Sequence, residues 1–190
     1  MREKYNLPLD KLVFIYGGNL GKPQGIDFLI KCLDSNKHRK DCHFIIVGNG
    51  TEYGKIERWI ADAKPTNVSL HSRLSKEDYD NLLQSCDVGL IFLDYRFTIP
   101  NFPSRLLGYI DKKMPVILAT DPNTDMGRMA EENMFGKACF SNDVNAFTVI
   151  VNAFVSNPKE IAAMGERGYE FMKANYLVEN TFNAIMQHIK

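Results

Sequence analysis

Residues 99–121 read Ile-Pro-Asn-Phe-Pro-Ser-Arg-Leu-Leu-Gly-Tyr-Ile-Asp-Lys-Lys-Met-Pro-Val-Ile-Leu-Ala-Thr-Asp, and they join two elements of an α/β fold. Two prolines stiffen the loop at the start, and Ser104 and Arg105 then open an amphipathic helix. The unbroken apolar run at 116–119 predicts a buried strand. A helix leading directly into a buried strand is typical of a sheet covered by helices.

The start of this helix is also a candidate anion site. A helix N-terminus offers unpaired backbone N–H groups and a positive dipole end, and Ser104 and Arg105 add a hydroxyl and a guanidinium. Together these groups suit a phosphate. The same pattern also fits a capped helix that only packs on a sheet, so the segment by itself leaves both interpretations open.

The rest of the chain repeats the alternation of short apolar runs and helical patterns. This alternation predicts an α/β fold, Rossmann-like, with three α/β/α layers and a mainly parallel sheet of about six strands. We expect the strands at Leu12–Tyr16, His43–Val47, Val68–His71, Val88–Leu93, Pro115–Ala119 and Ala138–Phe140. We expect the helices between them to begin near Gln24, Glu52, Lys76, Ser104, Asp125 and Val144.

The pattern changes after residue 157, where two helical segments, 159–175 and 178–189, follow one another without a strand. No Pro/Gly-rich linker divides the chain. We therefore expect residues 1–190 to form a single Rossmann-like domain that ends on paired helices.

Composition excludes several classes of protein. Hydrophobic residues make up 45% and charged residues 24% of the chain, as in ordinary globular domains. Lys plus Arg equals Asp plus Glu at 23 each, so no positive field indicates a nucleic-acid partner. No apolar run approaches the about 20 residues that cross a bilayer. The four scattered cysteines favour free thiols in the reducing cytoplasm.

Small, polar or basic residues follow the expected strands. The first strand leads into a glycine-rich turn at 17–25, and the second leads into Val47-Gly48-Asn49-Gly50-Thr51. The third and fourth lead into segments 71–75 and 94–98, which contain arginines. Because ligands of open α/β sheets bind beyond the carboxyl ends of the strands, these turns predict a phosphate or nucleotide site. A crevice lined for packing alone is the alternative.

Other candidates for chemistry are weaker. Asp121 and Asp125 are interpreted first as a turn former and a helix N-cap, and a metal role is the second interpretation. Ser75 with Asp78 three residues later predicts a capping pair at a helix start. The four histidines form no ligand cluster in the sequence, and no Gly-x-Ser-x-Gly turn indicates a hydrolase.

Taken together, four segments resemble the C-terminal half of GT-B glycosyltransferases, and family 4 in particular. They are the turn at 17–25, the turn at 47–51, the run Ser85–Leu90 and the Pro-Ser-Arg-Leu-Leu-Gly-Tyr segment at 103–109. The resemblance covers nearly the whole chain in the right order. It is greatest to the branch that builds bacterial capsular or lipopolysaccharide sugar chains.

The resemblance implies a nucleotide-sugar donor, UDP- or GDP-linked, and transfer with retention of configuration, without a metal or other cofactor. The residues that it places at the diphosphate are Gly18, Asn19, Leu20, Lys22, Ser104 and Arg105. It places the nucleoside at Gly48, Arg73 and Leu74, and the donor sugar near Asn101, Phe102 and Pro103.

Four positions depart from the family pattern. Asn19 and Gln24 stand where the family usually has cations for the diphosphate, and Pro100 and Gly108 stand where it usually has two glutamates that contact the donor. Lys22 and Arg105 are the candidate replacement cations. No catalytic residue is assigned, because the acidic positions are not matched.

The resemblance also implies partners. A GT-B enzyme has a second, N-terminal domain that binds the acceptor, a saccharide or a lipid-linked sugar, and residues 158–190 would pack back toward it. We expect such an enzyme in the cytoplasm or peripherally at the inner face of the cell membrane. The alternatives are a stand-alone nucleotide-binding subunit beside a separate acceptor-binding protein, and a degenerate domain that no longer binds a donor.

Overall fold

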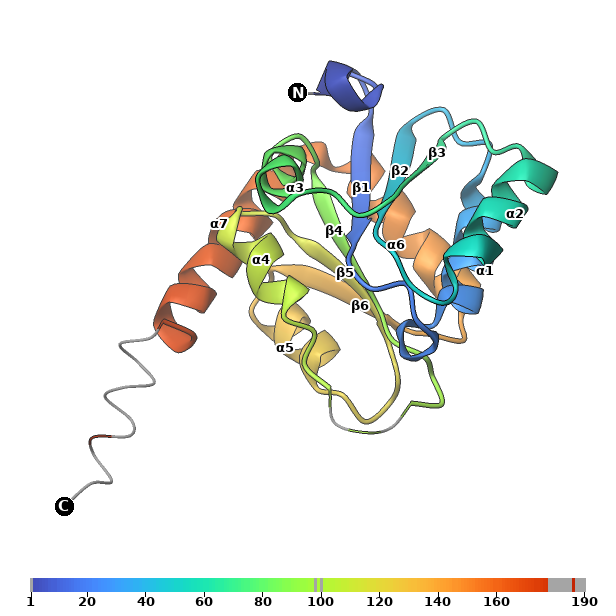
Figure 1. Cartoon of the computed structure of the whole chain (residues 1–190). Coiled ribbons are helices and arrows are strands. Elements are labelled where there is room, and N and C mark those ends of the chain that lie inside the picture. The colour runs from blue at the N-terminus through green and yellow to red at the C-terminus, as the bar shows by residue number, and fades with distance from the viewer. Residues whose placement is uncertain (1, 98, 100, 178–185, 187–190) are drawn as a thin grey trace.

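The structure, a computed structural model, describes residues 2–97, 99, 101–177 and 186. It is a six-stranded parallel sheet with helices on both faces (Figure 1). The strands are β1 (Leu12–Gly17), β2 (Cys42–Val47), β3 (Val68–His71), β4 (Val88–Phe92), β5 (Val116–Thr120) and β6 (Gly136–Phe140). The α-helices are α1 (Ile26–Asn36), α2 (Tyr53–Ala63), α3 (Lys76–Leu83), α4 (Arg105–Asp111), α5 (Met126–Glu132), α6 (Val144–Ser156) and α7 (Pro158–Asn175). Two short 3-10 helices, η1 (Arg2–Tyr5) and η2 (Lys22–Gln24), precede β1 and α1.

The strand order is β3-β2-β1-β4-β5-β6, so the chain returns to the middle of the sheet after β3 and adds β4 on the other side of β1. The point where such an order reverses leaves a crevice at the carboxyl ends of the central strands. Here the crevice lies beyond β1, which pairs along its whole length with β2 and more briefly with β4.

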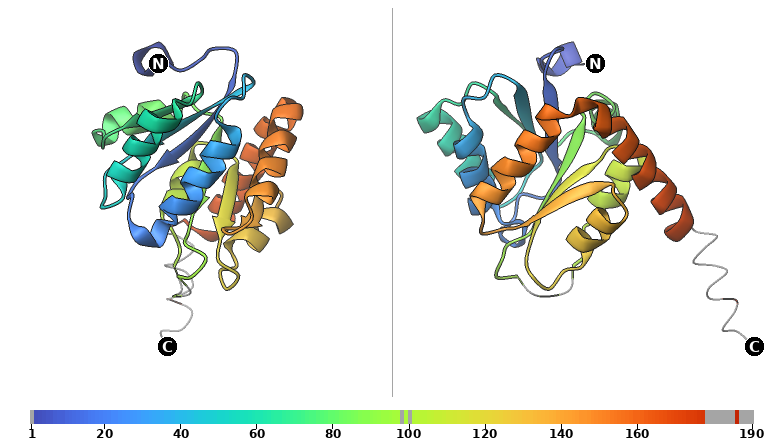
Figure 2. Two further views of the ribbon diagram at one scale, coloured as in Figure 1. Left: turned by 90° about the vertical axis from the view of Figure 1, so that its right-hand side faces the viewer. Right: turned by 180° about the vertical axis from the view of Figure 1, so that it is seen from behind.

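Alternate side chains of each strand enter two separate cores, because successive residues of a strand face opposite sides of the sheet. Phe14 and Tyr16 of β1 belong to the core under α1, α2 and α6. Val13 and Ile15 belong to the core under α3, α4 and α5, which the end of α7 also covers. The view from behind in Figure 2 shows α1 and α6 across the first of these faces.

These elements confirm the predicted fold class, and a strand lies at each of the six predicted places along the chain. Three strands differ at their starts, and the first of these, β2, begins one residue early at Cys42. Pro115 precedes β5, although its carbonyl still accepts the N–H of Gly89, and β6 begins two residues early at Gly136. The first terminal helix appears as α7, whereas the predicted helix 178–189 lies almost entirely outside the described residues. Among the described residues, no helix is both long and apolar enough to cross a membrane.

Candidate functional site

Two glycine turns, after β1 and after β2, pack directly against each other. The N–H of Gly18 donates to the carbonyl of Val47 at 2.9 Å, and the N–H of Leu20 donates to the carbonyl of Asn49 at 3.0 Å. Gly18 has φ +131° and Gly48 has φ +158°. A Cβ added to Gly48 would lie 1.8 Å from the Gly18 carbonyl oxygen. The two turns therefore form one rigid floor that only glycine at position 48 permits.

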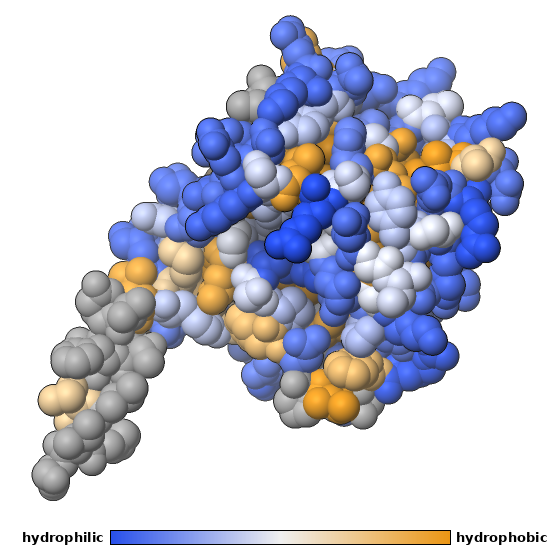
Figure 3. All heavy atoms as spheres, viewed as in Figure 1, coloured by the Kyte–Doolittle hydropathy of each residue, from blue (hydrophilic) through white to orange (hydrophobic). Residues whose placement is uncertain are grey.

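A cavity of about 580 Å³ lies over this floor, at the carboxyl ends of β1 and β2 and beside the starts of α3 and α4. Its lining consists of Gly17, Gly18, Asn19, Val47, Gly48, Asn49, Arg73, Leu74, Lys76, Tyr79, Ser104 and Arg105. Figure 3 shows strongly hydrophilic side chains near the centre of this face of the molecule. The volume of the cavity falls in the range of small-molecule sites.

Arg105 is the most constrained cation of the cavity. Its Nη2 donates to Oε1 of Gln24 at 2.8 Å, and its guanidinium carbon lies 4.5 Å from the centre of the Tyr16 ring. The same carbon lies 3.3 Å from the point where Gly18 would carry a Cβ. Its Nη1 is buried and has no hydrogen-bond partner among the described residues. A buried charged donor without a partner is costly, so this atom is suited to an anionic ligand.

The tyrosines around Arg105 leave its charge uncancelled. Burial raises the pKa of the Tyr16, Tyr79 and Tyr109 hydroxyls, although Arg105 opposes that shift in each. All three therefore stay neutral at physiological pH. Tyr109 also accepts the N–H of Gly17 at 3.0 Å, which anchors α4 to the end of β1.

The rest of the lining adds positive charge. Arg73 and Lys76 come from the β3–α3 loop and the first turn of α3, and both are exposed. The side-chain oxygen of Asn49 accepts the backbone N–H of Arg73 at 3.2 Å, which ties that loop to the second glycine turn. None of the described residues that line the cavity is acidic. The cavity thus suits a ligand with several negative charges.

The structure brings most of the expected phosphate and nucleoside residues to this cavity. Those that line it are Gly18, Asn19, Gly48, Arg73, Leu74, Ser104 and Arg105. Leu20 does not line it, because its side chain is fully buried and its N–H is bonded to Asn49. Lys22 is exposed on η2 and also lies outside the lining.

The start of α4 differs from the expected anion-binding helix end. The helix has 7 residues, and Ser104 precedes it in helical conformation without a side-chain cap. The N–H of Leu106 already donates to the carbonyl of Pro103 at 3.0 Å. The anion-binding capacity of this segment therefore lies in the Arg105 side chain more than in backbone N–H groups.

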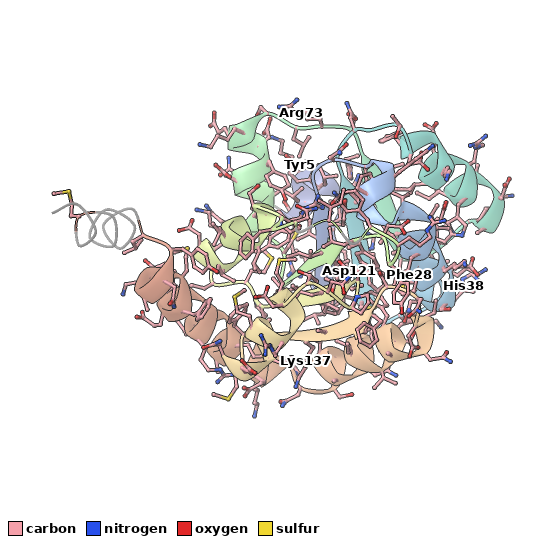
Figure 4. All side chains as sticks on the ribbon, turned by 90° about the horizontal axis from the view of Figure 1, so that it is seen from below. Tyr5, Phe28, His38, Arg73, Asp121 and Lys137 are labelled. Carbon is pink, nitrogen blue, oxygen red and sulfur yellow. The ribbon has the colours of Figure 1, made fainter. Side chains whose placement is uncertain are left out.

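The residues expected near the donor sugar lie elsewhere. Asn101 and Phe102 line a second cavity of about 410 Å³ together with Asp121, while Pro103 is buried. The Phe102 ring stacks on Tyr176, with centroids 5.7 Å apart. In Figure 4, Asp121 lies near the middle of the view and Arg73 lies apart from it, toward the top.

The predicted caps and turns are confirmed in part. Asp121 is 4% exposed and accepts the N–H groups of Asn123 and Thr124, as expected of a turn former. Asp125 precedes α5 but makes no side-chain cap. Ser75 accepts the N–H of Asp78 and caps α3, as predicted. Pro100, at one of the usual glutamate positions, lies outside the described residues.

Five lining residues were not among the predicted site residues: Gly17, Val47, Asn49, Lys76 and Tyr79. Asn49 belongs to the glycine turn at 47–51 that the sequence indicated, so its place in the lining agrees with that prediction. Lys76 and Tyr79 lie one helical turn apart on α3, so they share a face, but nothing local shows that this face points to the end of β1.

Comparisons with known proteins identify the family of this chain. Residues 1–171 match the family model described as glycosyl transferases group 1. The chain is 21% identical over 166 residues to the probable glycosyltransferase WbjE of Pseudomonas aeruginosa, covering 87% of this chain and 41% of that protein. It is 23% identical over 131 residues to the putative colanic acid biosynthesis glycosyl transferase WcaI of Escherichia coli, covering 69% and 32%. The chain thus spans less than half the length of these relatives.

A solved structure supports the fold. HepE of Anabaena, crystallised in complex with UDP and glucose, superposes with a TM-score of 0.79 at 16% identity, covering 98% of this chain and 50% of that one. With its α/β sheet and the family match over residues 1–171, this chain belongs to the group 1 glycosyl transferases and is a GT-B, family 4-like glycosyltransferase domain.

Proposed function

We propose that this domain binds the nucleoside diphosphate part of a UDP- or GDP-sugar, for a retaining glycosyltransferase that builds a bacterial surface polysaccharide or glycolipid. The single observation that carries the proposal is the buried, unpartnered Nη1 of Arg105 beside Gly18, in a cavity whose charged side chains are all cationic. The UDP in HepE, a protein of the same fold, supports the choice of ligand.

The chemistry asked of these residues is neutralisation of the leaving diphosphate. As the bond between sugar and phosphate breaks, negative charge grows on the phosphate oxygens, and donors already in place stabilise it without reorganisation. Arg105 supplies a buried guanidinium, and Lys76 and Arg73 supply exposed charges. We propose that these cations replace a metal ion in that role.

Backbone donors contribute less than the glycine turns suggest. The N–H groups of Gly18, Leu20 and Gly48 all donate to carbonyls within the fold. Binding therefore depends mainly on side-chain charge, which makes affinity sensitive to ionic strength.

We propose that the nucleoside lies on the Gly48–Arg73–Leu74 side of the cavity, where Asn49 holds the Arg73 loop. The donor sugar would then extend toward Asn101 and Phe102 at the second cavity. The acceptor, a saccharide or lipid-linked sugar, would be bound by an N-terminal domain in the same protein. Such an enzyme would act in the cytoplasm, at the inner face of the membrane for a lipid-linked acceptor.

Calorimetric titration of the 190-residue chain with UDP, GDP, UMP and uridine tests the proposal. We expect one of the diphosphates to bind in the micromolar to millimolar range, tighter than its monophosphate, because each additional charged contact strengthens binding. No heat for either diphosphate would favour the degenerate-domain alternative and refute the proposal.

A turnover assay tests whether sugar transfer requires a second, acceptor-binding domain. Because the acceptor side is proposed to lie in another domain, the purified 190-residue chain should bind donor without transferring sugar to added acceptors. Sugar transfer by this chain alone would contradict the proposed division of roles.

A further inference from the structure

We infer that Gln24 is a positioning residue: it holds the Arg105 guanidinium toward the cavity while leaving its positive charge available to the ligand. The inference rests on the proposed function, since the ligand is the diphosphate of the donor. It concerns a residue outside the cavity lining that contacts the ligand only through Arg105.

Gln24 is itself held firmly. It is 9% exposed and ends η2, where its N–H donates to the carbonyl of Gly21 at 3.0 Å. The neighbouring carbonyl of Pro23 accepts the N–H of Asp94 at 2.9 Å, which ties η2 to the segment after β4. The backbone of Gln24 is therefore held in place, and its buried side chain presents the acceptor to Arg105.

The guanidinium is oriented by two contacts of different kinds. Gln24 accepts from Nη2 at 2.8 Å, and the guanidinium carbon lies over the Tyr16 ring, 4.5 Å from its centre. One contact is a hydrogen bond to a single nitrogen, and the other is a cation–π contact. The orientation that results leaves Nη1 without a partner among the described residues.

The neutral charge of Gln24 matters as much as its geometry. Arginine has donors only, so the partner atom must be an acceptor, which an amide oxygen supplies without a charge. A carboxylate at the same place would accept the same hydrogen bond but would form a buried ion pair. Such a pair cancels the field that an anionic ligand would use. Gln24 therefore orients the Arg105 guanidinium without neutralising its charge.

The test compares Gln24→Glu with Gln24→Ala in the 190-residue chain, using UDP and GDP as probes and uridine as the uncharged reference. We expect Gln24→Glu to fold with an unchanged or higher Tm, because it gains a charged hydrogen bond. Its diphosphate affinity should fall about tenfold or more, because the guanidinium is paired within the protein. Uridine binding should not change. Gln24→Ala should weaken the diphosphate less than Gln24→Glu.

Gln84→Glu is the matched control, since it makes the same change at an exposed glutamine at the end of α3, outside the cavity lining, and it should leave diphosphate affinity unchanged. If Gln24 only stabilised the fold, diphosphate affinity would change in parallel with Tm in both Gln24→Glu and Gln24→Ala. Diphosphate affinity of Gln24→Glu within twofold of the unmodified chain would overturn the inference, and so would a larger loss in Gln24→Ala than in Gln24→Glu. Absence of diphosphate binding in the unmodified chain would instead refute the proposed function.

Discussion

Replacing Arg105 by alanine removes the most buried cation of the cavity. The guanidinium now lies between Oε1 of Gln24 and the Tyr16 ring, and its Nη1 has no partner among the described residues. The proposed diphosphate would take that atom as a donor. The variant therefore loses a charged hydrogen bond to the ligand together with the nearest fixed positive charge.

The magnitude follows from the burial of this group. Hydrogen bonds to charged groups contribute about 1.5–3 kcal/mol, which corresponds to roughly a tenfold to 150-fold rise in the Kd for UDP or GDP. Stability should change less than binding, because a buried cation contributes little net stability and its neighbours Tyr16 and Gln24 keep their own anchors.

The assay is calorimetric titration of Arg105→Ala with UDP, GDP and uridine at two salt concentrations. The salt dependence of diphosphate binding should become shallower, and uridine binding should stay unchanged. Arg128→Ala is the control, because Arg128 lies on α5 beside a different cavity. An unchanged diphosphate Kd in Arg105→Ala would refute the assignment of Arg105 to the site.

Lys76→Ala should weaken the same diphosphate about threefold to tenfold by calorimetry, as expected for an exposed charge at the rim. Gly48→Ala should lower the free energy of unfolding by about 2 kcal/mol or more in urea titrations, since its Cβ would meet the Gly18 carbonyl; Gly108→Ala, which meets nothing within 4 Å, should be neutral or stabilising. Burial lowers the pKa of His43 to about 4, from an ordinary value of 6.5, so the neutral form stabilises the fold above pH 6.5 and that stabilisation is lost as the pH falls toward 4. His43→Gln should flatten the fall in unfolding free energy over that range, and an equally steep fall in the variant would contradict the assignment.

The fold was predictable because it depends on local patterns. A strand buried on both faces must be apolar throughout, and the run at 116–119 carries that signal without help from the rest of the chain. The start of β6 was not predictable in this way. Gly136 is hidden in the sheet because Val116 leaves no room for a side chain, and a packing contact of that kind has no local signature.

The site was predictable where backbone geometry decides it, and not where long-range packing does. Glycines after β1 and β2 indicated a close approach of chain to ligand, and both turns do line the cavity. Leu20 and Lys22 lie outside the lining: the N–H of Leu20 donates to Asn49 where the two turns pack on each other, and Lys22 is exposed on η2. Lys76 and Tyr79 were not predicted because it is the long-range placement of α3 that brings them to the end of β1.

The central claim is that a nucleoside diphosphate binds over the paired glycine turns beside Arg105. The most direct measurement is a titration of the ¹⁵N-labelled chain with UDP and with GDP, followed by backbone amide NMR shifts. We expect the largest shifts at residues 17–19, 48–49, 73–76 and 104–105, with the Arg105 side-chain signals among them. Shifts confined to the second cavity around Asp121, or to no region for either nucleotide, would contradict it.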